Sequence, residues 1–238
     1  MAKIQKILIH KDKKYFWKGS DMHTEHGVIY AKDIKKAKKL VKSHKGVEFT
    51  VSGANFLDMI ERIKRGPQTL LPKDLATILF YSGVDKESKV LDAGTGCGLL
   101  AITLARAAKS VVSYERNKKN IEIAKYNQEL LGIENLKIRY KDIYEGITEK
   151  NLDIITLDLP EPWQVLPHAL KALKSGGRLI SYLPSVPQVM ELVERAEGFW
   201  VIRVFETLER DWKVEGRAVR PRSKMMAHTA FITILRKK

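Results

Sequence analysis

From residue 89 onward, short and largely apolar segments alternate with longer segments that have helical periodicity. Apolar strands are typical of a parallel sheet covered on both faces, and each parallel crossover needs a long connection, usually a helix. The alternation therefore predicts an α/β fold with helices on both sides of a mostly parallel sheet. The predicted strands are 89–93, 111–115, 136–140, 152–159 and 178–183, and the predicted helices between them are 97–108, 117–131, 162–173 and 186–196.

Two further strands, 200–207 and 229–235, close the chain with no helix predicted between them. Adjacent strands without a crossover helix favour an antiparallel pair. We therefore expect a mostly parallel seven-stranded sheet with an antiparallel pair at one edge and an antiparallel final strand. The Gly176-Gly177 pair is expected to end the helix 162–173.

Residues 1–65 have a different pattern, in which short strand-like pieces are separated by turn glycines. Segments 3–9 and 46–51 are predicted strands, and together they indicate a small β-rich module. The basic segment 31–45 fits either a helix or a loop. Segment 56–64 has the apolar spacing of a helix.

The Gly66-Pro67 pair marks the expected boundary between a small domain at 1–65 and the α/β domain at 66–238. The chain has 43 Lys and Arg residues against 28 Asp and Glu residues, a net charge of +15. Residues 1–65 contain 16 basic and 7 acidic residues, whereas residues 66–238 contain 27 and 21. This asymmetry favours a polyanionic partner such as a nucleic acid, with a lysine-rich thermophilic surface as the alternative.

The composition excludes several classes of protein. The single cysteine, Cys97, excludes an internal disulfide and a cysteine-cluster metal site, and no metal is expected. No apolar run approaches the roughly 18 uncharged residues that a membrane span needs. The basic N-terminus lacks the long apolar core of a signal peptide, so we expect a cytoplasmic protein with no membrane partner.

Three alternating glycines, Gly94, Gly96 and Gly98, follow the strand 89–93. Glycines let the backbone approach a ligand closely at the start of a helix. The spacing differs from the G-x-G-x-x-G turn that cradles a diphosphate, and an acid, Asp92, precedes it. A carboxylate at this place suits a cationic ligand such as S-adenosylmethionine (SAM), which carries an ammonium and a sulfonium.

Two more acids follow the next two strands. Glu115 ends strand 111–115, where a carboxylate can accept hydrogen bonds from both hydroxyls of a ribose. Asp142 follows strand 136–140, where a carboxylate can accept from the amine of adenine. Because neighbouring parallel strands end at the same edge of a sheet, these acids and the glycine turn together predict a SAM site.

The fourth strand ends at Asp158, and Pro160, Pro162 and Trp163 follow it. The prolines keep the exit of the strand extended. We expect Asp158 to stand where the methyl group of SAM points. Trp163 either faces the substrate or packs in the core.

The chain resembles the tRNA (adenine-58-N1) methyltransferase family over nearly its whole length, and the combination of motifs is specific. The matching motifs are Asp21-Met22-His23-Thr24, Gly27-Val28-Ile29, Gly46, Gly66-Pro67-Gln68, Pro72-Lys73-Asp74, Val90–Gly98, Ser113-Tyr114-Glu115, Leu157-Asp158-Leu159, Pro162-Trp163, Tyr182-Leu183-Pro184, Phe205-Glu206-Thr207-Leu208, Trp212, Arg220-Pro221-Arg222 and His228-Thr229-Ala230-Phe231.

This resemblance implies a class I, Rossmann-like SAM-dependent methyltransferase domain behind a small β domain, assembled as a homotetramer. It implies methylation of N1 of adenine 58 in the T-loop of tRNA, with adenine 57 as a second candidate, to give 1-methyladenosine. Asp158 would be the catalytic residue, between SAM and the adenine. The residues that would bind SAM are Gly94, Gly96, Cys97, Gly98, Leu99, Glu115, Asn120, Asp142 and Asp158.

The sequence departs from the family pattern at one position. Members often carry an aromatic residue or a histidine, facing the target base, just before the Pro-Lys-Asp motif, and this chain has Leu71 there. We therefore expect Gln68, Thr69 and Trp163 to hold the base. His228 is expected to hold structure near the last strand rather than to act as a base.

Two other functions explain the residues less completely. A SAM-dependent methyltransferase of a small anionic metabolite, such as a corrinoid precursor, would have a similar glycine turn but no use for the basic first domain. A non-catalytic RNA-binding partner would have no need of the acids Glu115, Asp142 and Asp158.

Overall fold

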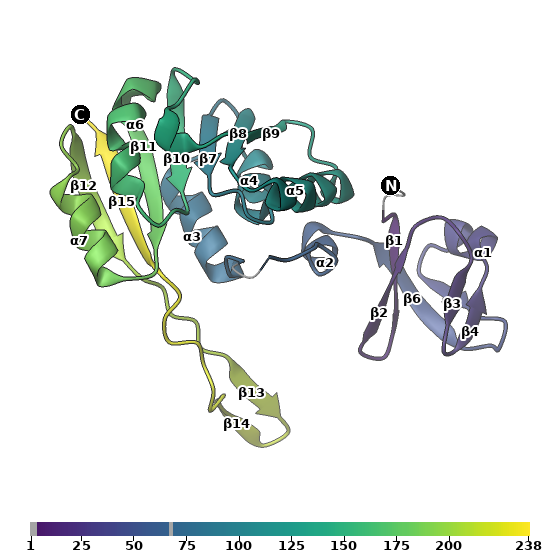
Figure 1. Ribbon diagram of the computed structural model, residues 1–238. Helices are drawn as coiled ribbons and strands as arrows, with labels where there is room; N and C mark the ends of the chain where they lie inside the picture. The colour runs from purple at the N-terminus through teal and green to yellow at the C-terminus, as the bar shows by residue number, and fades with distance from the viewer. Residues whose placement is uncertain (1–3, 67–68) are drawn as a thin grey trace. The chain divides into compact units, whose positions relative to one another are not determined.

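The computed structural model describes residues 4–66 and 69–238, and the contacts within the chain divide it into two units. The N-terminal unit comprises the described residues up to Lys64 together with Tyr126–Gly132. The C-terminal unit comprises Arg65–Lys125 and Ile133–Lys238. Figure 1 labels the helices and strands of both units.

A four-stranded antiparallel sheet in the order β2-β1-β6-β5 forms the centre of the N-terminal unit, so its predicted β-rich character is confirmed. The elements are β1 (Lys6–His10), β2 (Lys13–Trp17), β3 (Met22–Thr24), β4 (Gly27–Ile29), α1 (Ala31–Lys36), β5 (Leu40–Lys42), β6 (Glu48–Gly53) and α2 (Phe56–Ile60). The core is made of Leu8, Trp17, Ile29, Ile34, Val41, Phe49 and Val51. A helix of this unit thus contributes Ile34 to a core built mainly from strands.

The basic segment 31–45, which fits both a helix and a loop by sequence, contains the helix α1 followed by the strand β5. The Lys6 ammonium donates hydrogen bonds to three carbonyl oxygens at the end of α1, at 2.8–3.0 Å. A cation at this place satisfies carbonyls that have no partner inside the helix and opposes the negative end of the helix dipole. The contact explains why such a short helix ends here.

A seven-stranded sheet in the order β12-β15-β11-β10-β7-β8-β9 forms the C-terminal unit. β15 runs antiparallel to both of its neighbours, and the other described pairs are parallel. The predicted fold, a mostly parallel seven-stranded sheet with an antiparallel final strand, is confirmed. The strands are β7 (Lys89–Ala93), β8 (Ser110–Glu115), β9 (Leu136–Tyr140), β10 (Leu152–Leu157), β11 (Leu173–Leu183), β12 (Phe199–Phe205) and β15 (Phe231–Lys237).

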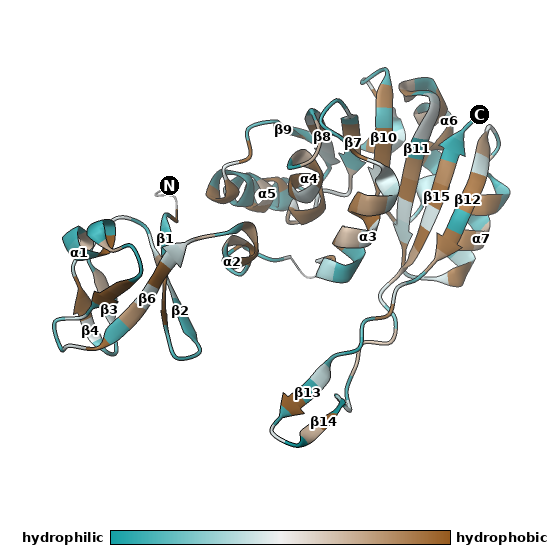
Figure 2. Ribbon diagram, turned by 180° about the vertical axis from the view of Figure 1, so that it is seen from behind, coloured by the Kyte–Doolittle hydropathy of each residue, from teal (hydrophilic) through white to brown (hydrophobic). Residues whose placement is uncertain are grey.

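Helices cover both faces of this sheet, as the views from opposite sides in Figures 1 and 2 show. α6 and α7 pack on β11 on one side, and α3 and α4 lie on the other. Apolar residues of β7, β10 and β11 meet those of α6 and α7 in a hydrophobic core on one face of the sheet. The helical elements are α3 (Pro72–Ser82), α4 (Leu99–Ala105), α5 (Lys118–Leu131), η1 (Ile143–Glu145), η2 (Pro162–Val165), α6 (Leu166–Ala172) and α7 (Val186–Glu194).

The Gly176-Gly177 pair lies inside β11 and does not end the preceding helix, contrary to the prediction from sequence. α6 already ends at Ala172, because the backbone of Leu173 is extended. The pairing of β10 with β11 shifts its register in this region, and Gly176 has a φ of +74°. The glycines therefore accommodate an irregularity in a strand, as glycines in strands often do.

Several elements are absent from the sequence prediction, among them β2, β3 and β4 of the N-terminal unit, and two features of the C-terminal unit illustrate the reason. One is α3, which has a proline in its first turn and ends at Gly83 with a φ of +66°, both common helix boundaries. The other is a two-stranded sheet of β13 (Trp212–Glu215) and β14 (Ala218–Pro221), between β12 and β15. Its strands have only four residues each and their apolar residues are exposed, so the sequence gives little signal for them.

The strands β10, β7, β8 and β9 are parallel neighbours, so their carboxyl ends lie along one edge of the sheet. The glycine turn and the acids named above follow these strands. Ligands of open α/β sheets bind at this edge. Among the described residues, no helix is long and apolar enough to cross a membrane.

Candidate active site

Two cavities lie at the carboxyl edge of the seven-stranded sheet and share the residues Asp158, Leu159 and Pro160. The first has a volume of about 460 Å³ and extends over the ends of β7, β8 and β9. The second has a volume of about 600 Å³ and extends toward the ends of β11 and the start of β15. Both volumes are in the range of small-molecule sites, about 300–1,000 Å³. The site therefore has room for two ligands that would meet at Asp158.

The glycine turn after β7 forms part of the first cavity. Gly94 has a φ of +86°, and a Cβ built on it would overlap the carbonyl oxygen of Asp158. The Asp158 N–H in turn donates to the carbonyl of Ala93 at 2.9 Å. Only glycine allows this close approach of the two strand ends. Gly94 therefore fixes Asp158 next to the turn.

Glu115 supports the same turn from the end of β8. Its Oε2 accepts from the backbone N–H of Gly96 at 3.0 Å, and its Oε1 accepts from the N–H of Asn117 at 2.8 Å. The Asn120 side chain approaches Oε2 at 3.3 Å. A carboxylate has about four acceptor sites, so Glu115 keeps capacity for the hydroxyls of a ribose. The carboxylate both holds the turn and faces the cavity.

Asp142 lies at the other end of the first cavity, after β9. Its Oδ1 caps η1 by accepting from the N–H of Tyr144 at 3.0 Å, and its Oδ2 lies 3.4 Å from the Arg116 guanidinium. Ile143 and Tyr144 line the cavity beside it. An apolar and aromatic wall next to a carboxylate suits a flat base with an exocyclic amine.

The structure corrects the role expected for Asp92. This residue is 1% exposed and does not line either cavity, so its carboxylate does not face a ligand. Its oxygens accept from Ser113 at 2.6 Å and from Thr156 at 2.8 Å. These are its neighbours on the adjacent strands, which explains why three polar side chains meet inside the sheet. Burial raises the pKa of Asp92 to about 6.

Asp158 is the acid that both cavities share. Burial, together with the nearby negative charge of Asp92, raises the pKa of its carboxyl to about 7. A buried carboxylate without a cationic partner is stabilised by any positive charge that enters the site. Asp158 is thus ready to interact with a ligand on which positive charge develops.

Thr69, Leu71, Tyr182 and His228 are among the residues that line the second cavity. His228 donates through Nδ1 to Glu206 at 2.7 Å and lies 3.0 Å from the carbonyl oxygen of Pro184 through Nε2. The hydrogen bond to Glu206 is the main reason why the pKa of His228 is raised. Because both partners are acceptors, the doubly protonated ring satisfies them, and no nitrogen is left to act as a base.

The chain is similar to known proteins in sequence and in structure. A family model described as the tRNA methyltransferase complex GCD14 subunit matches residues 62–231. The Methanocaldococcus jannaschii protein named tRNA (adenine(57)-N(1)/adenine(58)-N(1))-methyltransferase TrmI is 34% identical, over 97% of this chain and 94% of its own. The chain belongs to this tRNA methyltransferase family.

Two solved structures are also similar over the full length. The tRNA (m1A58) methyltransferase TrmI from Aquifex aeolicus has a TM-score of 0.80 and 26% identity, and the match covers 98% of this chain and 96% of that one. A structure from Thermotoga maritima, described as a SAM-dependent O-methyltransferase, has a TM-score of 0.85 and 28% identity, with 100% and 94% covered. Their descriptions agree on methyl transfer and differ in the acceptor atom.

Most of the residues expected to bind SAM line the first cavity. The residues found there are Gly94, Gly96, Glu115, Asn120, Asp142 and Asp158. Cys97, Gly98 and Leu99 do not line it. Cys97 and Leu99 are 4% and 7% exposed, and a Cβ on Gly98 would lie 3.0 Å from Ala124 of α5. This part of the turn packs α4 and α5 together.

The residues expected to hold the target base are divided. Thr69 lines the second cavity, and Gln68 is outside the described residues. Trp163 packs against the hydrophobic core that lies between the sheet and the helices α6 and α7, and it does not line either cavity. Leu71 also lines the second cavity, at the position where the family often has an aromatic residue or a histidine. The second cavity therefore has an aliphatic wall there.

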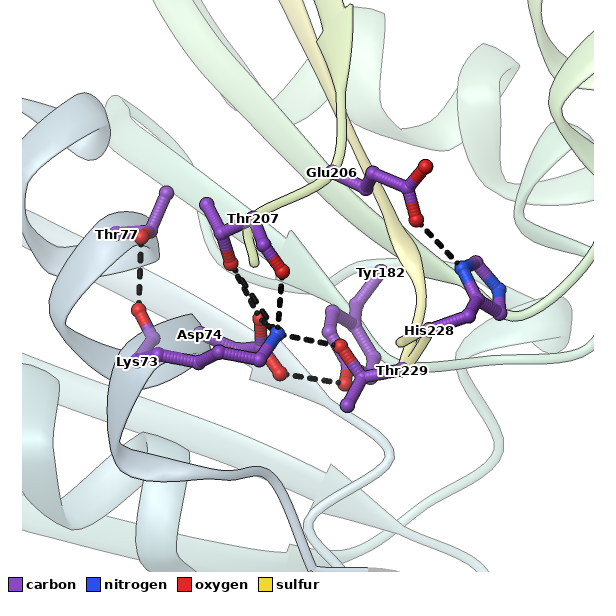
Figure 3. A network of polar contacts seen from close by, with 8 residues as sticks. All are labelled: Lys73, Asp74, Thr77, Tyr182, Glu206, Thr207, His228 and Thr229. Atoms are coloured by element: carbon purple, nitrogen blue, oxygen red, sulfur yellow. Dashed lines mark hydrogen bonds and ion pairs between the residues drawn. The ribbon is translucent and has the colours of Figure 1, made fainter. Parts of the chain in front are cut away.

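Sequence reasoning missed a polar network behind the second cavity, which Figure 3 shows. The Lys73 ammonium contacts Asp74 at 2.7 Å, the hydroxyl and the carbonyl of Thr207 at 3.2 and 2.9 Å, and the hydroxyl of Thr229 at 2.7 Å. Asp74 also accepts from Tyr182 at 3.0 Å and from Thr207 at 3.0 Å. All five residues lie in motifs that match the family, which was the available signal.

Groups that could hold a metal ion are absent from the part of the chain that the structure describes.

Proposed function

We propose that this protein transfers a methyl group from SAM to N1 of adenine 58 in the T-loop of tRNA, giving 1-methyladenosine. The observation that carries the proposal is the pair of cavities joined at Asp158 in a member of a tRNA methyltransferase family. The first cavity fits SAM and the second fits the target base. Adenine 57 is the second candidate target, since the relative from M. jannaschii is named for both positions.

The residues of the first cavity fit SAM by their chemistry. Glu115 would hold the ribose, Asp142 the adenine amine, and the Gly94–Gly96 turn the amino-acid part of the molecule. When bound, SAM supplies an electrophilic methyl group on a positively charged sulfur. The residues that would hold SAM thus lie beside Asp158, at the boundary of the two cavities.

Asp158 would act on the charge that develops during transfer. The lone pair of adenine N1 forms the new bond to carbon while the bond from carbon to sulfur breaks, so the positive charge moves from sulfur to the adenine ring. The ionised Asp158 accepts a hydrogen bond from the exocyclic amine and stabilises the cationic ring. Neutral adenine loses no proton from N1, so no strong base is needed.

The target adenine is stacked in folded tRNA and must be extruded, at a cost of a few kcal/mol. We assign the grip on the tRNA backbone to the small basic domain, residues 1–65, ahead of the catalytic domain, residues 66–238. In the N-terminal unit, seven exposed lysines follow one another along α1 and β5, and we call them the lysine strip: Lys32, Lys35, Lys36, Lys38, Lys39, Lys42 and Lys45.

The charge balance of the lysine strip supports this assignment. Asp33 is the only acid between residues 30 and 46, and among the residues that the structure describes no carboxylate pairs with a lysine of the strip. On the other side of the domain, Lys13 pairs with Glu25 at 2.6 Å and Lys14 with Asp58 at 2.9 Å. Lysines that do not pair with a carboxylate of their own chain can neutralise phosphates.

A homotetramer is part of the proposal. The edge strand β12 exposes Trp200, Val201, Ile202 and Val204, and Figure 2 shows the apolar stretch along this strand. An edge strand has one side without a neighbouring strand, and an apolar surface on such a strand favours association with another chain. Light scattering at micromolar concentration should give four times the mass of the chain, and a monomer would contradict the assembly. The proposal also includes a cytoplasmic location, in keeping with the proposed tRNA substrate.

The test of the function is incubation of an unmodified tRNA transcript with the protein and SAM, followed by mass spectrometry of the nucleosides. The expected product is 1-methyladenosine, and it should decrease when adenine 58 of the transcript is replaced by guanosine and disappear when adenines 57 and 58 are both replaced. Replacement of adenine 57 alone measures how much of the 1-methyladenosine forms at that position. Methylation of a ribose oxygen, or no methylation of RNA, would contradict the proposal and favour an O-methyltransferase or a metabolite enzyme.

A further inference from the structure

Lys73 is the centre of the network in Figure 3 and has no place in the chemistry proposed above. Its side chain is 9% exposed, and that of its partner Asp74 is fully buried. Burying an ammonium is unfavourable by several kcal/mol unless its donors are satisfied. A lysine is therefore kept at such a place only by a defined set of partners, and the structure shows these partners.

All the donors of Lys73 are used within the protein. An ammonium has three N–H donors, and Lys73 has four acceptor atoms within 3.2 Å, from Asp74, Thr207 and Thr229. No donor is left for a substrate, and Lys73 does not line either cavity. Lys73 therefore acts through its neighbours rather than on the reacting atoms.

Those neighbours come from four parts of the C-terminal unit. Lys73 and Asp74 begin α3, Tyr182 is near the end of β11, Thr207 follows β12, and Thr229 precedes β15. Thr207 and Thr229 are the two ends of the segment that contains β13 and β14. One ammonium thus holds both ends of this segment, and the adjacent pair of Glu206 and His228 joins them a second time, at 2.7 Å.

The network ends at the wall of the second cavity. Tyr182 and Thr229 line that cavity, whereas Asp74 and Thr207 lie behind it. Asp74 accepts from the Tyr182 hydroxyl and from Thr207, so the carboxylate that pairs with Lys73 also sets the position of an aromatic wall residue. A change at Lys73 is therefore transmitted to two wall residues, Tyr182 directly through Asp74 and Thr229 through its own hydroxyl.

We infer that Lys73 is a positioning residue of the methyl transfer: its buried ammonium holds the two ends of segment 207–229 and orients Asp74, and thereby fixes the wall of the cavity that receives the target base. The inference rests on the proposed function, because it assigns the second cavity to the base. It deepens that function by naming a residue that acts on the rate without contact with either ligand.

The test is Lys73→Met, which removes the charge and keeps most of the side-chain volume. We expect the rate of single-turnover methylation of tRNA at saturating SAM to fall about 10- to 100-fold, because an error of about 1 Å in the position of a reacting group costs that much. The dissociation constant for SAM should stay within about twofold, since the first cavity contains none of these partners.

The matched control is Lys237→Met in the same unit. The Lys237 ammonium donates to the carbonyl oxygens of Leu170 and Leu173 at 2.5 and 2.7 Å, and it lines neither cavity. This substitution removes a comparable set of hydrogen bonds, so it should lower the midpoint of thermal unfolding but leave the methylation rate within about twofold. Equal losses of rate in both variants would show that Lys73 serves stability alone.

A second variant keeps the test decisive if Lys73→Met does not fold. Thr207→Val has nearly the same shape and removes one hydroxyl that accepts from Lys73 and donates to Asp74. Thr207 is outside both cavities, so a several-fold loss of rate with unchanged SAM binding would support transmission through the network. A normal rate in Thr207→Val would contradict it.

Hydrogen exchange separates this inference from the proposed function. In Lys73→Met without ligands, amides near residues 207 and 229 should exchange faster than in the unchanged protein. If the unchanged protein does not methylate tRNA, the proposed function is wrong and the role of Lys73 falls with it. If the unchanged protein and Lys73→Met methylate tRNA equally fast, only the role of Lys73 is overturned.

Discussion

Glu115 and Lys73 of the C-terminal unit are almost fully buried and held by defined partners, whereas the lysines of the strip in the N-terminal unit are exposed and have no carboxylate partner among the described residues. The Glu115 carboxylate accepts from two backbone N–H groups, and the backbone N–H of Asp158 donates to the carbonyl of Ala93 at the end of the neighbouring strand. The lysines of the strip are on a short helix, a short strand and the residues next to them, and their side chains are exposed.

This difference reflects two kinds of electrostatic work. Charge that acts on a transition state must be placed in advance in a site of low dielectric constant, because the reaction leaves no time for reorganisation. Charge that attracts a polyanion acts through counterion release, which needs the number of cations rather than their precise placement. Substitutions in the two units should therefore change different measurements.

The largest effect is expected for Asp158→Ala. If the carboxylate stabilises charge that develops during transfer, kcat should fall about 100-fold or more. The affinity for tRNA should barely change, because phosphate contacts supply most of it. Single-turnover methylation with saturating SAM and tRNA measures the effect. A near-normal rate would show that Asp158 takes no part in the mechanism. The charges of the two units would then not differ in function in the way described above.

Glu115→Ala is expected to have the second largest effect, on SAM rather than on tRNA. The carboxylate holds the N–H groups of Gly96 and Asn117 and faces the first cavity, so its removal loosens the turn and deletes acceptors for the ribose. The dissociation constant for SAM, measured by calorimetry, should rise about 10- to 100-fold, in keeping with charge-assisted hydrogen bonds. Unchanged affinity would place the ribose elsewhere.

A smaller effect is expected in the N-terminal unit. The triple variant Lys35→Gln, Lys38→Gln and Lys39→Gln should weaken tRNA binding about 10-fold at low salt. Its slope of log K against log salt should be smaller by about 2 to 3, because each lysine releases close to one counterion. Methylation at saturating tRNA should remain near normal.

The matched control removes three lysines from the β1–β2 side of the same unit: Lys11→Gln, Lys13→Gln and Lys18→Gln. Lys13 is already neutralised by Glu25 at 2.6 Å, and the hydrogen bond from Lys13 helps to lower the pKa of Glu25 to about 2. The control should change tRNA affinity less than the strip variant. Equal losses in the two variants would show that net charge alone determines binding and that the strip has no special role.

The sequence predicts much of the fold because the signals are local. The strand 89–93 and the acids at the ends of the next strands follow from apolar runs and from the rule that parallel strands end at one edge. Glu115, Asp142 and Asp158 could therefore be placed near one another without coordinates. The Gly176-Gly177 pair misled because a glycine pair ends a helix and interrupts a strand equally well.

The rest depends on contacts between residues distant in sequence. Asp92 turns inward because Ser113 and Thr156 flank it on neighbouring strands, and this register is not visible in the sequence of β7 alone. The partners of Lys73 are up to 156 residues away, so no local pattern announces them. A match to a family motif indicates that such residues contribute to the structure or the function, but only the three-dimensional contacts show how.

The last expected effect is a change of stability with pH at Asp158, and it carries a clear sign. The pKa of the folded state is raised to about 7 by burial, against about 3.9 for an unfolded aspartate. Between these values the folded state binds more protons than the unfolded state, so stability falls as the pH rises from about 4 to 7. Asp158→Asn removes the ionisable group. Its advantage in unfolding free energy over the unchanged protein should grow across this window to about 4 kcal/mol, since the two pKa values differ by about three units at about 1.36 kcal/mol each, and stay constant above it.

Denaturant unfolding at pH 4, 6 and 8 measures this difference between the two proteins. Methylation by the unchanged protein should rise over the same window, because the carboxylate is the active form, and Asp158→Asn should lack this rise. The site would then be least stable where it is most active, which is common when buried charge serves catalysis. An advantage of Asp158→Asn that does not vary with pH would show that the carboxyl has an ordinary pKa. Asp158 would then be no more specialised than the carboxylates that pair with lysines in the N-terminal unit.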